Sequence, residues 1–414
     1  MEVIINNERE FSDYLVKDYN SDLDYKVYTK ISVGNNNDKI IFNYKISFPL
    51  SAFFFRNISK KYITLNDAFN FEFKKCSFNE EVKISEIEAN ITFDNCDFND
   101  NLVLHSFKGI QTYVDCTFIE GKQINAEDSV FDGKMRFRTC HFKGNVNFRN
   151  TTFSNLADFW RCVFYNKTIF YKTDFMNIVV LSAVTFKEDV LFTYSLIDKL
   201  LLLRGAKVEK GFDLSLAIIT GKLGLFDFIL NDYETIITKT EKDYETAVSE
   251  TAFIPLKNKR ETFRILKSNL ESQMNLAESL KFKAIEKDAL LEELKLENGF
   301  SNFFERANLF LNRVSNNHGT SYISAFVFII VVGWFFFYCS LLTTDKYIFN
   351  WHISQWEFSE GFKLFIEFLN PIHKFDYIEN TTLSSAWFYV FDFLGKTFVG
   401  YGIYQFIQAF RKYK

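Results

Sequence analysis

Large apolar side chains recur every eleven residues through the middle of this chain. The series begins with six phenylalanines and continues in phase to Leu230: Phe131, Phe142, Phe153, Phe164, Phe175 and Phe186. The residue two positions before each of them is small, as at Ser129 and Cys140. Positions i−2 and i point the same way on an extended chain, because side chains alternate across a strand. The pattern predicts extended segments that each bury one small and one large side chain.

A second apolar position follows each member of the series by six residues, from Phe137 to Leu225. An eleven-residue period also suits a right-handed coiled coil. Phe, Thr, Asn and Asp dominate these segments, however, where a long helix would favour Ala, Leu, Glu and Lys. We therefore expect a solenoid, in which each coil buries its core face against its neighbours.

Five cysteines occupy the small position at intervals of 20 to 24 residues: Cys76, Cys96, Cys116, Cys140 and Cys162. Such spacing places the thiols near one wall of a solenoid whose coils are about this long. Cys is a common small core residue, which is the interpretation we favour. Redox sensing is the alternative, although buried thiols react slowly. The cysteines form no C-x-x-C pair, so no zinc site is expected.

The segments CSFNE (76–80), CDFND (96–100), CTFIE (116–120), CHFKG (140–144) and CVFYN (162–166) fit a small-x-Phe-x-x unit. This unit resembles the pentapeptide-repeat family, over roughly residues 69–230. The resemblance implies a right-handed parallel β-helix with four five-residue faces per turn. The six-residue faces from 131 onward depart from that family and leave the strand registers open. We expect the β-helix at 61–231 and an N-terminal cap at 1–60, where the apolar-rich run Phe48–Phe55 follows the loop Gly34–Asp38.

The pattern changes to helical after the solenoid. Residues 232–255 are polar and are expected to form a linker. Residues 256–298 are rich in Leu, Lys, Glu and Ala and predict a helical hairpin that turns near Gln273–Asn275 and is capped by Gly299. We interpret this hairpin as a packing platform for the solenoid end.

Residues 299–318 form the next predicted helix and are amphipathic. Their apolar residues recur at helical spacing: Phe300, Phe303, Phe304, Ala307, Phe310, Leu311 and Val314. Such a helix can pack on protein or lie in a membrane interface. The uncharged segment that follows favours the interface.

Tyr322–Leu342 is 21 residues long and carries no charge. At 1.5 Å per residue it spans about 30 Å, one hydrocarbon core. A second predicted span covers about 383–410, so that 319–414 would form a transmembrane hairpin. The connecting segment is acidic, whereas Arg306, Arg313 and the C-terminal residues are basic. The positive-inside rule then places both termini in the cytoplasm, with Trp351, Trp356 and Trp387 at the outer interface and a short helix around Phe358–Leu369.

Asp392 and Lys396 stand four residues apart inside the second predicted span. They share a helix face, and charges at this depth are costly unless they are paired or line a cavity. We favour a neutralised pair that locks helix packing, within the chain or between protomers. A polar pathway for ions and a span that ends before Lys396 are the alternatives.

Three glycines follow in the same helix: Gly395, Gly400 and Gly402. The string Thr397–Gly402 invites comparison with the potassium-channel filter, but it contains an additional Phe398. A filter also needs a full inner helix after it, and twelve residues follow Gly402. We interpret the glycines as small residues that permit close helix contact.

The composition of the chain and its lack of catalytic motifs exclude several classes of function. With 48 Lys+Arg against 52 Asp+Glu, the formal net charge of −4 excludes a generally basic nucleic-acid binder. No phosphate-loop, nucleophile-elbow or H-E-x-x-H motif occurs, so we expect no enzyme and no cofactor. His105 and His141 are expected to face solvent. The start MEVIINNEREF lacks the basic and apolar regions of a signal peptide.

The order of solenoid, helical neck and apolar hairpin resembles membrane-associated bacterial pentapeptide-repeat proteins, some of which are ion-channel-like. We therefore expect a multi-pass inner-membrane protein with a cytoplasmic β-helix that serves as an interaction or sensing scaffold. Its expected partners are the lipid bilayer, further copies of the chain and an unidentified protein. An oligomeric channel or pore-forming effector is the second hypothesis. A DNA-mimic role, known in the family, is disfavoured by the near-neutral charge.

Overall fold

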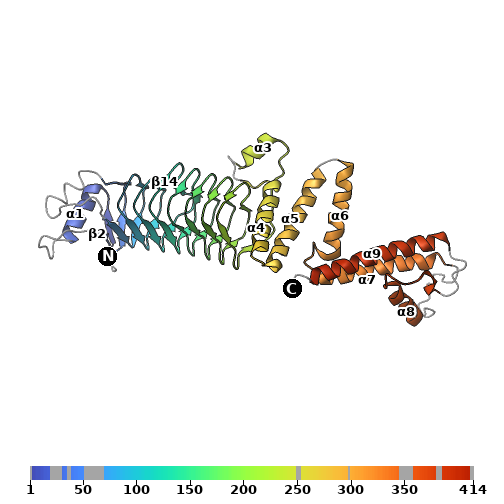
Figure 1. The fold of residues 1–414 in the computed structure, drawn as a ribbon. Helices are drawn as coiled ribbons and strands as arrows, with labels where there is room; N and C mark the ends of the chain where they lie inside the picture. The colour runs from blue at the N-terminus through green and yellow to red at the C-terminus, as the bar shows by residue number, and fades with distance from the viewer. Residues whose placement is uncertain are drawn as a thin grey trace. The chain divides into compact units, whose positions relative to one another are not determined.

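The computed structural model describes residues 2–18, 30–34, 39–50, 70–248, 253–296, 299–344, 358–378 and 385–410. They divide into two compact units, Met1–Thr262 and Phe263–Lys414, which are described in turn. The first unit is a parallel β-solenoid, and the described part of the second is helical (Figure 1).

Four parallel sheets form the walls of the solenoid. Sheet A consists of β1 (Glu2–Ile5), β3 (Lys39–Phe42), β6 (Cys76–Phe78), β9 (Asp97–Phe98), β12 (Thr117–Phe118), β16 (His141–Phe142), β20 (Val163–Phe164), β24 (Thr185–Phe186), β28 (Lys207–Val208) and β32 (Ile229–Leu230). Sheet B consists of β2 (Lys30–Val33), β5 (Asn70–Lys74), β8 (Ile91–Asp94), β11 (Gln111–Val114), β15 (Met135–Arg138), β19 (Ala157–Asp158), β23 (Ile178–Val180), β27 (Leu200–Leu202) and β31 (Lys222–Gly224).

The other two sheets complete each coil. Sheet C consists of β4 (Ile46–Phe48), β7 (Val82–Ile84), β10 (Leu102–Leu104), β13 (Gln123–Asn125), β17 (Asn145–Asn147), β21 (Thr168–Ile169), β25 (Val190–Leu191) and β29 (Phe212–Asp213). Sheet D consists of β14 (Val130–Phe131), β18 (Thr152–Phe153), β22 (Asp174–Phe175), β26 (Leu196–Ile197) and β30 (Ile218–Ile219). The predicted parallel β-helix is therefore confirmed.

The eleven-residue phenylalanine series is divided between two sheets. Phe142 pairs with Phe164 in sheet A, whereas Phe153 pairs with Phe175 in sheet D. Successive members alternate between these sheets, so a full coil takes 22 residues. The rings of Phe142 and Phe164 stack with centroids 4.4 Å apart, and those of Phe153 and Phe175 with centroids 5.1 Å apart. All six predicted phenylalanines are buried, and stacked pairs of this kind add to the burial of apolar area.

The small residue before each core phenylalanine has a polar role as well as a steric one. Thr151 Oγ1 donates a hydrogen bond to the carbonyl of Ala126, one coil earlier, at 2.6 Å. Cys162 Sγ contacts the Phe137 carbonyl in the same way at 3.2 Å. A hydroxyl or thiol at this position therefore fills a small space and satisfies a buried carbonyl oxygen.

The registers left open by the sequence follow from local backbone geometry. Phe78, Phe98 and Phe118 are paired at steps of 20 residues, and the step from Phe118 to Phe142 is longer by four. Two of the four additional residues lie before sheet C, in the loop that contains Gly121 at φ +78°, because Leu102 pairs with Ile124. The other two lie between sheets C and B, because Gln111 pairs with Met135. From there on, a residue in the left-handed conformation lies two positions before each strand of sheet D: Asp128, Asn150, Lys172, Tyr194 and Leu216.

The sheets extend further toward the N-terminus than expected. We predicted a cap over residues 1–60, but β1 and β3 already pair in sheet A, and β4 pairs with β7 in sheet C. Helix α1 (Glu8–Asp18) follows β1, and its Phe11 ring lies 5.2 Å from that of Phe42. Residues 1, 19–29, 35–38 and 51–60 of the predicted cap lie outside the described residues.

A buried polar cluster closes the other end of the solenoid. The Asp213 carboxylate, at the end of β29, accepts hydrogen bonds from Thr193 Oγ1 at 2.6 Å, Ser215 Oγ at 2.6 Å and Asn258 Nδ2 at 2.9 Å. Asn258 lies in the first turn of α4 (Leu256–Ser272). One turn further, Thr262 Oγ1 accepts a hydrogen bond from the Leu214 amide at 2.9 Å. The start of α4 thus supplies partners to the last strand of sheet C.

The expected linker 232–255 contains ordered structure. Tyr233 is buried and its hydroxyl donates to the Phe212 carbonyl at 2.6 Å. Helix α3 (Glu241–Thr246) has a capping box formed by Thr240 and Asp243. Residues 249–252 lie outside the described residues.

The second unit begins within α4, which forms the predicted helical hairpin with α5 (Leu276–Leu296). Lys267 Nζ on α4 lies 2.7 Å from Glu286 Oε2 on α5. Met274 makes the turn at φ +59°. Gly299 is not the cap of α5 but the N-cap residue of α6 (Phe300–Asn316), with an extended backbone. The prediction for Gly299 was wrong because a Gly between two helices fits either role.

The remaining helices are α7 (Tyr322–Leu342), α8 (Phe358–Phe368) and α9 (Ala386–Phe410), with a 3-10 turn, η3 (Phe375–Tyr377), between the last two. Helices α7 and α9 lie side by side (Figure 1). The rings of Phe336 and Phe398 stack between them at 5.5 Å. Within the described residues, α7 is the one helix that is long and apolar enough to cross a membrane. Residues 345–357, including Trp351 and Trp356, lie outside the described residues.

Candidate functional site

Asp392 and Lys396 meet on the inner side of α9. Asp392 is fully buried. Lys396 lies one helical turn further along α9 and forms an ion pair with it, in which Lys396 Nζ lies 2.8 Å from Asp392 Oδ2. The Lys396 ammonium also lies 3.7 Å from the centroid of the Phe375 ring, on η3. The ring face offers a second favourable environment for the cation. The sequence-predicted pair is therefore formed within one chain.

A histidine that the sequence did not single out completes this site. His373 Nε2 lies 2.8 Å from Asp392 Oδ1, so the two carboxylate oxygens face different cationic or donor groups. The His373 side chain is only 1% exposed. We name His373, Asp392 and Lys396 the buried charge cluster. The sequence gives no sign of this contact, because His373 and Asp392 meet only where the chain reverses between α8 and α9.

The segment after α8 positions His373. The amide of His373 donates to the Asn370 carbonyl at 3.0 Å, which turns the chain back toward α9. Its ring lies 5.4 Å from Phe368 and 4.6 Å from Tyr377, edge-on to the latter. These rings belong to an apolar core that also contains Phe337 and Phe388. The histidine is thereby held in an apolar surrounding with its nitrogen atoms directed at polar partners.

This arrangement favours one of the interpretations left open by the sequence. A buried carboxylate needs partners, and Asp392 finds Lys396 and His373 at hydrogen-bonding distance. Both belong to the same chain as Asp392, so the cluster joins α9 to the segment after α8. The geometry favours a packing lock over an open polar pathway.

Two of the three predicted glycines lie at close helix contacts. A Cβ on Gly402 would lie 2.7 Å from Ile329 Cγ1 of α7, and one on Gly395 would collide with the Phe368 ring. Gly400 differs, because the nearest atom to its Cβ would be Pro371 Cβ at 4.0 Å. Gly333 on α7, which was not predicted, is also buried at this contact, against Leu369.

The filter-like string Thr397–Gly402 lies in the interior of α9. Its carbonyl groups therefore make helical hydrogen bonds and do not line a loop of the kind that binds potassium.

Asparagine and glutamine side chains join α6 to α9. Asn316 Nδ2 donates to the backbone oxygen of Gln405 at 3.2 Å and to its side-chain oxygen. Gln405 Nε2 and the Tyr401 hydroxyl both donate to Asn312 Oδ1, at 3.0 and 3.2 Å. Asn312 and Asn316 thus pack α6 against α9.

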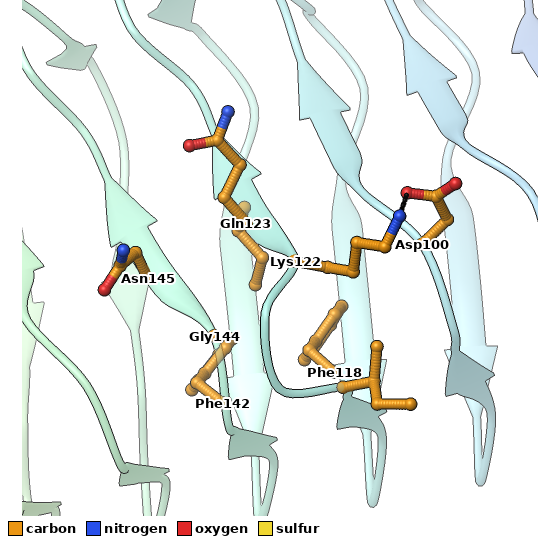
Figure 2. A pocket seen from close by; sticks show the side chains of 9 residues that line it. Asp100, Phe118, Lys122, Gln123, Phe142, Gly144 and Asn145 are labelled. Carbon is orange, nitrogen blue, oxygen red and sulfur yellow. Dashed lines mark ion pairs between the residues drawn. The ribbon is translucent and has the colours of Figure 1, made fainter.

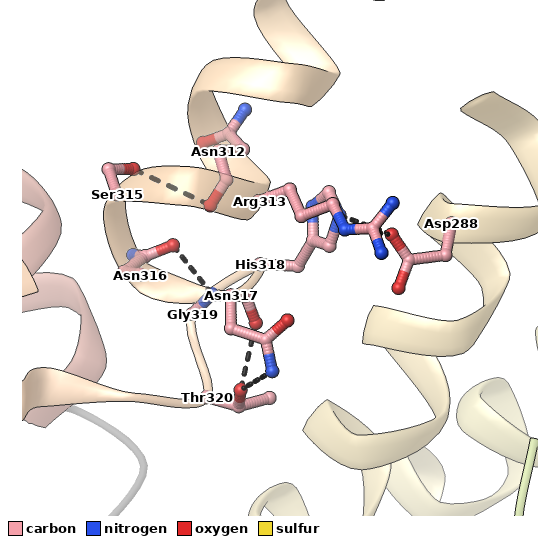
Figure 3. A network of polar contacts seen from close by, with 9 residues as sticks. All are labelled: Asp288, Asn312, Arg313, Ser315, Asn316, Asn317, His318, Gly319 and Thr320. Atoms are coloured by element: carbon pink, nitrogen blue, oxygen red, sulfur yellow. Dashed lines mark hydrogen bonds and ion pairs between the residues drawn. The ribbon is translucent and has the colours of Figure 1, made fainter. Parts of the chain in front are cut away.

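The turn from α6 to α7 carries a further polar network (Figure 3). Asn317, His318 and Gly319 all have positive φ, and the chain turns there from α6 into α7. His318 Nε2 lies 3.3 Å from Asp288 of α5, and Arg313 Nε lies 3.5 Å from the same oxygen. His318 is buried, whereas His105 and His141 are exposed on the solenoid as predicted. His352 lies outside the described residues.

A surface depression on the solenoid offers little as a binding site. Figure 2 shows it around Lys122, whose Nζ lies 2.9 Å from Asp100 Oδ1. The hydrogen bond from Lys122 holds the pKa of Asp100 below its usual value. The depression is too shallow to enclose a small molecule. Among the described residues, no group of three or more His, Cys, Asp or Glu side chains could hold a metal ion.

The five cysteines of the solenoid are buried free thiols. Burial raises the pKa of Cys116 and of Cys140 well above the ordinary value. A raised pKa lowers the fraction of reactive thiolate, which supports the structural interpretation of Cys116 and Cys140.

Comparison with known proteins finds a family match for one segment of the chain. Residues 126–174 match the family model of pentapeptide repeats (9 copies). This segment begins just before β14, ends at the first residue of β22 and covers part of the regular 22-residue coils, so the resemblance seen in the sequence is supported there. No curated protein and no solved structure matches the chain.

Proposed function

We propose that this chain is a non-enzymatic scaffold of the bacterial inner membrane, whose β-solenoid binds a protein partner and whose α7–α9 pair anchors it in the bilayer. The observation that carries the proposal is the outward face of α7. Seven of its apolar side chains are more than half exposed: Ile323, Phe326, Val327, Val331, Trp334, Phe335 and Leu342. A continuous apolar surface of this kind is unusual on a protein surrounded by water.

The second helix of the pair has a matching distribution. On α9, Trp387, Phe393, Tyr404 and Ile407 are more than half exposed, while Asp392 and Gln405 are buried against protein. Charged and polar groups thus face inward and apolar groups face outward, as required of a helix in hydrocarbon. This supports α9 as the second span, although its mean hydropathy is lowered by the charged pair.

Helices α6 and α8 support an interfacial position at the two ends of the pair. On α6, Phe303, Phe304 and Phe310 are more than half exposed, whereas Asn316 on its other face is buried. On α8, Phe358, Phe362 and Ile366 are exposed at four-residue steps. Exposed phenylalanine stripes on short amphipathic helices fit the boundary between headgroups and acyl chains.

The charges flanking the helices suggest the orientation. Arg306 and Arg313 precede α7, and Arg411, Lys412 and Lys414 follow α9 in the sequence. By the positive-inside rule both termini and the solenoid lie in the cytoplasm. A two-span anchor is also a common site of association, and we propose that the chain forms homo-oligomers through it.

Membrane fractionation tests the proposal. The full-length chain expressed in bacteria should sediment with membranes, resist extraction by alkaline carbonate and dissolve in mild detergent. The double variant Val331→Lys, Phe335→Lys places two charges on the outward face of α7 and should appear in the soluble or aggregated fraction.

The matched control is Ile218→Lys, at an exposed apolar residue of the solenoid. It should fractionate like the unchanged chain. A full-length chain that stayed soluble without detergent would refute the membrane anchor. Crosslinking in detergent then tests the oligomer, and a monomer at all protein concentrations would refute that part alone.

A further inference from the structure

His373 has acceptor atoms on both sides of its ring. Nδ1 lies 2.7 Å from the backbone oxygen of Asn370, and Nε2 lies 2.8 Å from Asp392 Oδ1. A backbone carbonyl oxygen can only accept a hydrogen bond, and an ionised carboxylate also only accepts. Both contacts are short enough to be full hydrogen bonds.

A neutral imidazole cannot make both bonds. It carries one N–H, so one of its nitrogen atoms would present a lone pair to an oxygen lone pair. Two hydrogen bonds need one more proton than a neutral histidine and an ionised aspartate hold together. That proton can reside on His373 Nε2 or on Asp392 Oδ1 with the same positions of the heavy atoms.

We propose that His373 and Asp392 together bind this additional proton, and that the bound proton latches residues 370–378 onto α9. When the proton leaves, one of the two hydrogen bonds is lost and the segment is held less firmly. The inference goes beyond the anchoring function, since it holds whether or not α9 crosses a bilayer.

The groups around His373 and Asp392 balance the charge of the cluster before the additional proton binds. On α9, Lys396 pairs with the other carboxylate oxygen and already balances the charge of Asp392. On η3, burial raises the pKa of Tyr377, with Asp392 and Glu367 of α8 adding to the effect, so this hydroxyl stays neutral. Lys374 is the adjacent residue in the chain. The side chains that α7 contributes here, such as Phe337, are apolar.

The additional proton changes both the charge of the cluster and its hydrogen bonds. The cluster with its additional proton carries a net positive charge and both hydrogen bonds. Without that proton it is neutral and has one bond fewer. The latch is therefore closed at low pH, where the additional proton is bound, and weakened once the pH is high enough to remove that proton.

Two measurements on the full-length chain in detergent or lipid test the proposal together. Nitrogen NMR of ¹⁵N-labelled histidine reports the protonation of both ring nitrogens, and His373→Gln assigns the His373 signals among those of the five histidines. Hydrogen exchange followed by mass spectrometry reports the opening of residues 370–378 at each pH, after correction for the intrinsic rate.

We expect His373 to show an additional proton shared with Asp392 at low pH. Loss of that proton should coincide with about fivefold faster exchange of residues 370–378, the effect of losing one hydrogen bond. His105→Gln, at an exposed histidine of the solenoid, should leave this transition unchanged.

Two results would overturn the proposal. One is a neutral single tautomer of His373, with Asp392 ionised, at every pH at which the chain is folded. The other is exchange of residues 370–378 that does not follow the titration. Both can be read from the unchanged chain, so the test does not depend on the folding of His373→Gln.

Discussion

Asn258 Nδ2 lies 2.9 Å from Asp213 Oδ2, and this hydrogen bond joins the first turn of α4 to the terminal strand of sheet C. An end strand of a solenoid has no further coil to pair with, so its polar groups need other partners. Here Asn258 and Thr262 supply them from a helix. The same asparagine accepts a hydrogen bond from the Tyr244 hydroxyl at 2.8 Å, which links α3 to the contact.

Replacing Asn258 by Ala should therefore destabilise this end of the solenoid. The buried Asp213 carboxylate would lose one donor, and Tyr244 would lose its acceptor, at a cost of about 1–3 kcal/mol. Urea unfolding of the full-length chain and hydrogen exchange of residues 212–215 measure the effect. Lys257→Ala, at the exposed preceding residue, is the control and should leave both unchanged. Equal stability of the Asn258 and Lys257 variants would contradict the role assigned to this hydrogen bond.

The same carboxylate predicts a dependence of stability on pH. Burial raises the pKa of Asp213, although the hydrogen bonds from Ser215, Thr193 and Asn258 lower it in part. A folded-state pKa above the unfolded value, about 3.9, gives stability that is fully present below that value and is lost as the pH rises through the folded pKa.

Asp213→Asn removes this titration, and an amide can still accept from Ser215 and pair with Asn258 after rotation. We expect the variant to gain stability relative to the unchanged chain as the pH is raised from about 4 to neutrality. Unfolding midpoints at a series of pH values provide the test. A difference that is constant across the series, or that has the opposite slope, would show that Asp213 does not titrate as inferred.

The contrast between Gly402 and Gly400 predicts unequal effects of one substitution on the same helix. Gly402→Val brings a side chain against Ile329 and Phe328 of α7 and should destabilise the helix pair by about 1–3 kcal/mol. Gly400→Val has room and should be tolerated, with a small change from helix propensity. Thermal unfolding of the helical signal in detergent compares the two variants. Similar midpoints for both would mean that α7 and α9 do not pack at Gly402.

The structural role of the cysteines predicts which thiols react. The five cysteines of the solenoid are buried, with at most 1% exposure, whereas Cys339 on α7 is partly exposed. A thiol reagent at about neutral pH should modify at most Cys339 in the folded chain and all six after denaturation. Cys339→Ala should remove the reaction of the folded chain. Rapid modification of Cys116 or Cys140 in the folded chain would instead favour redox sensing.

The periodicity of one side of the solenoid could be predicted because it is local. A buried strand needs large and small side chains at fixed spacing, and neighbouring coils repeat the same requirement, so the period of Phe131 to Phe186 is visible in the sequence. That alternate members lie in different sheets follows only from the closed coil, where each 22-residue turn brings Phe142 onto Phe164. The left-handed residues before sheet D, such as Asn150 and Lys172, carry no common side-chain type that would have marked them.

The sequence by itself determined the solenoid, the apolar length of α7 and the pairing of Asp392 with Lys396, because each depends on spacing within one strand or helix. Only the tertiary structure decided that His373 joins the pair, that Asn258 meets Asp213 and that Gly402 but not Gly400 contacts α7. These contacts depend on where a chain reversal or a neighbouring helix lies in space. Side chains separated by many residues are brought within hydrogen-bonding range by packing, which no periodic pattern records.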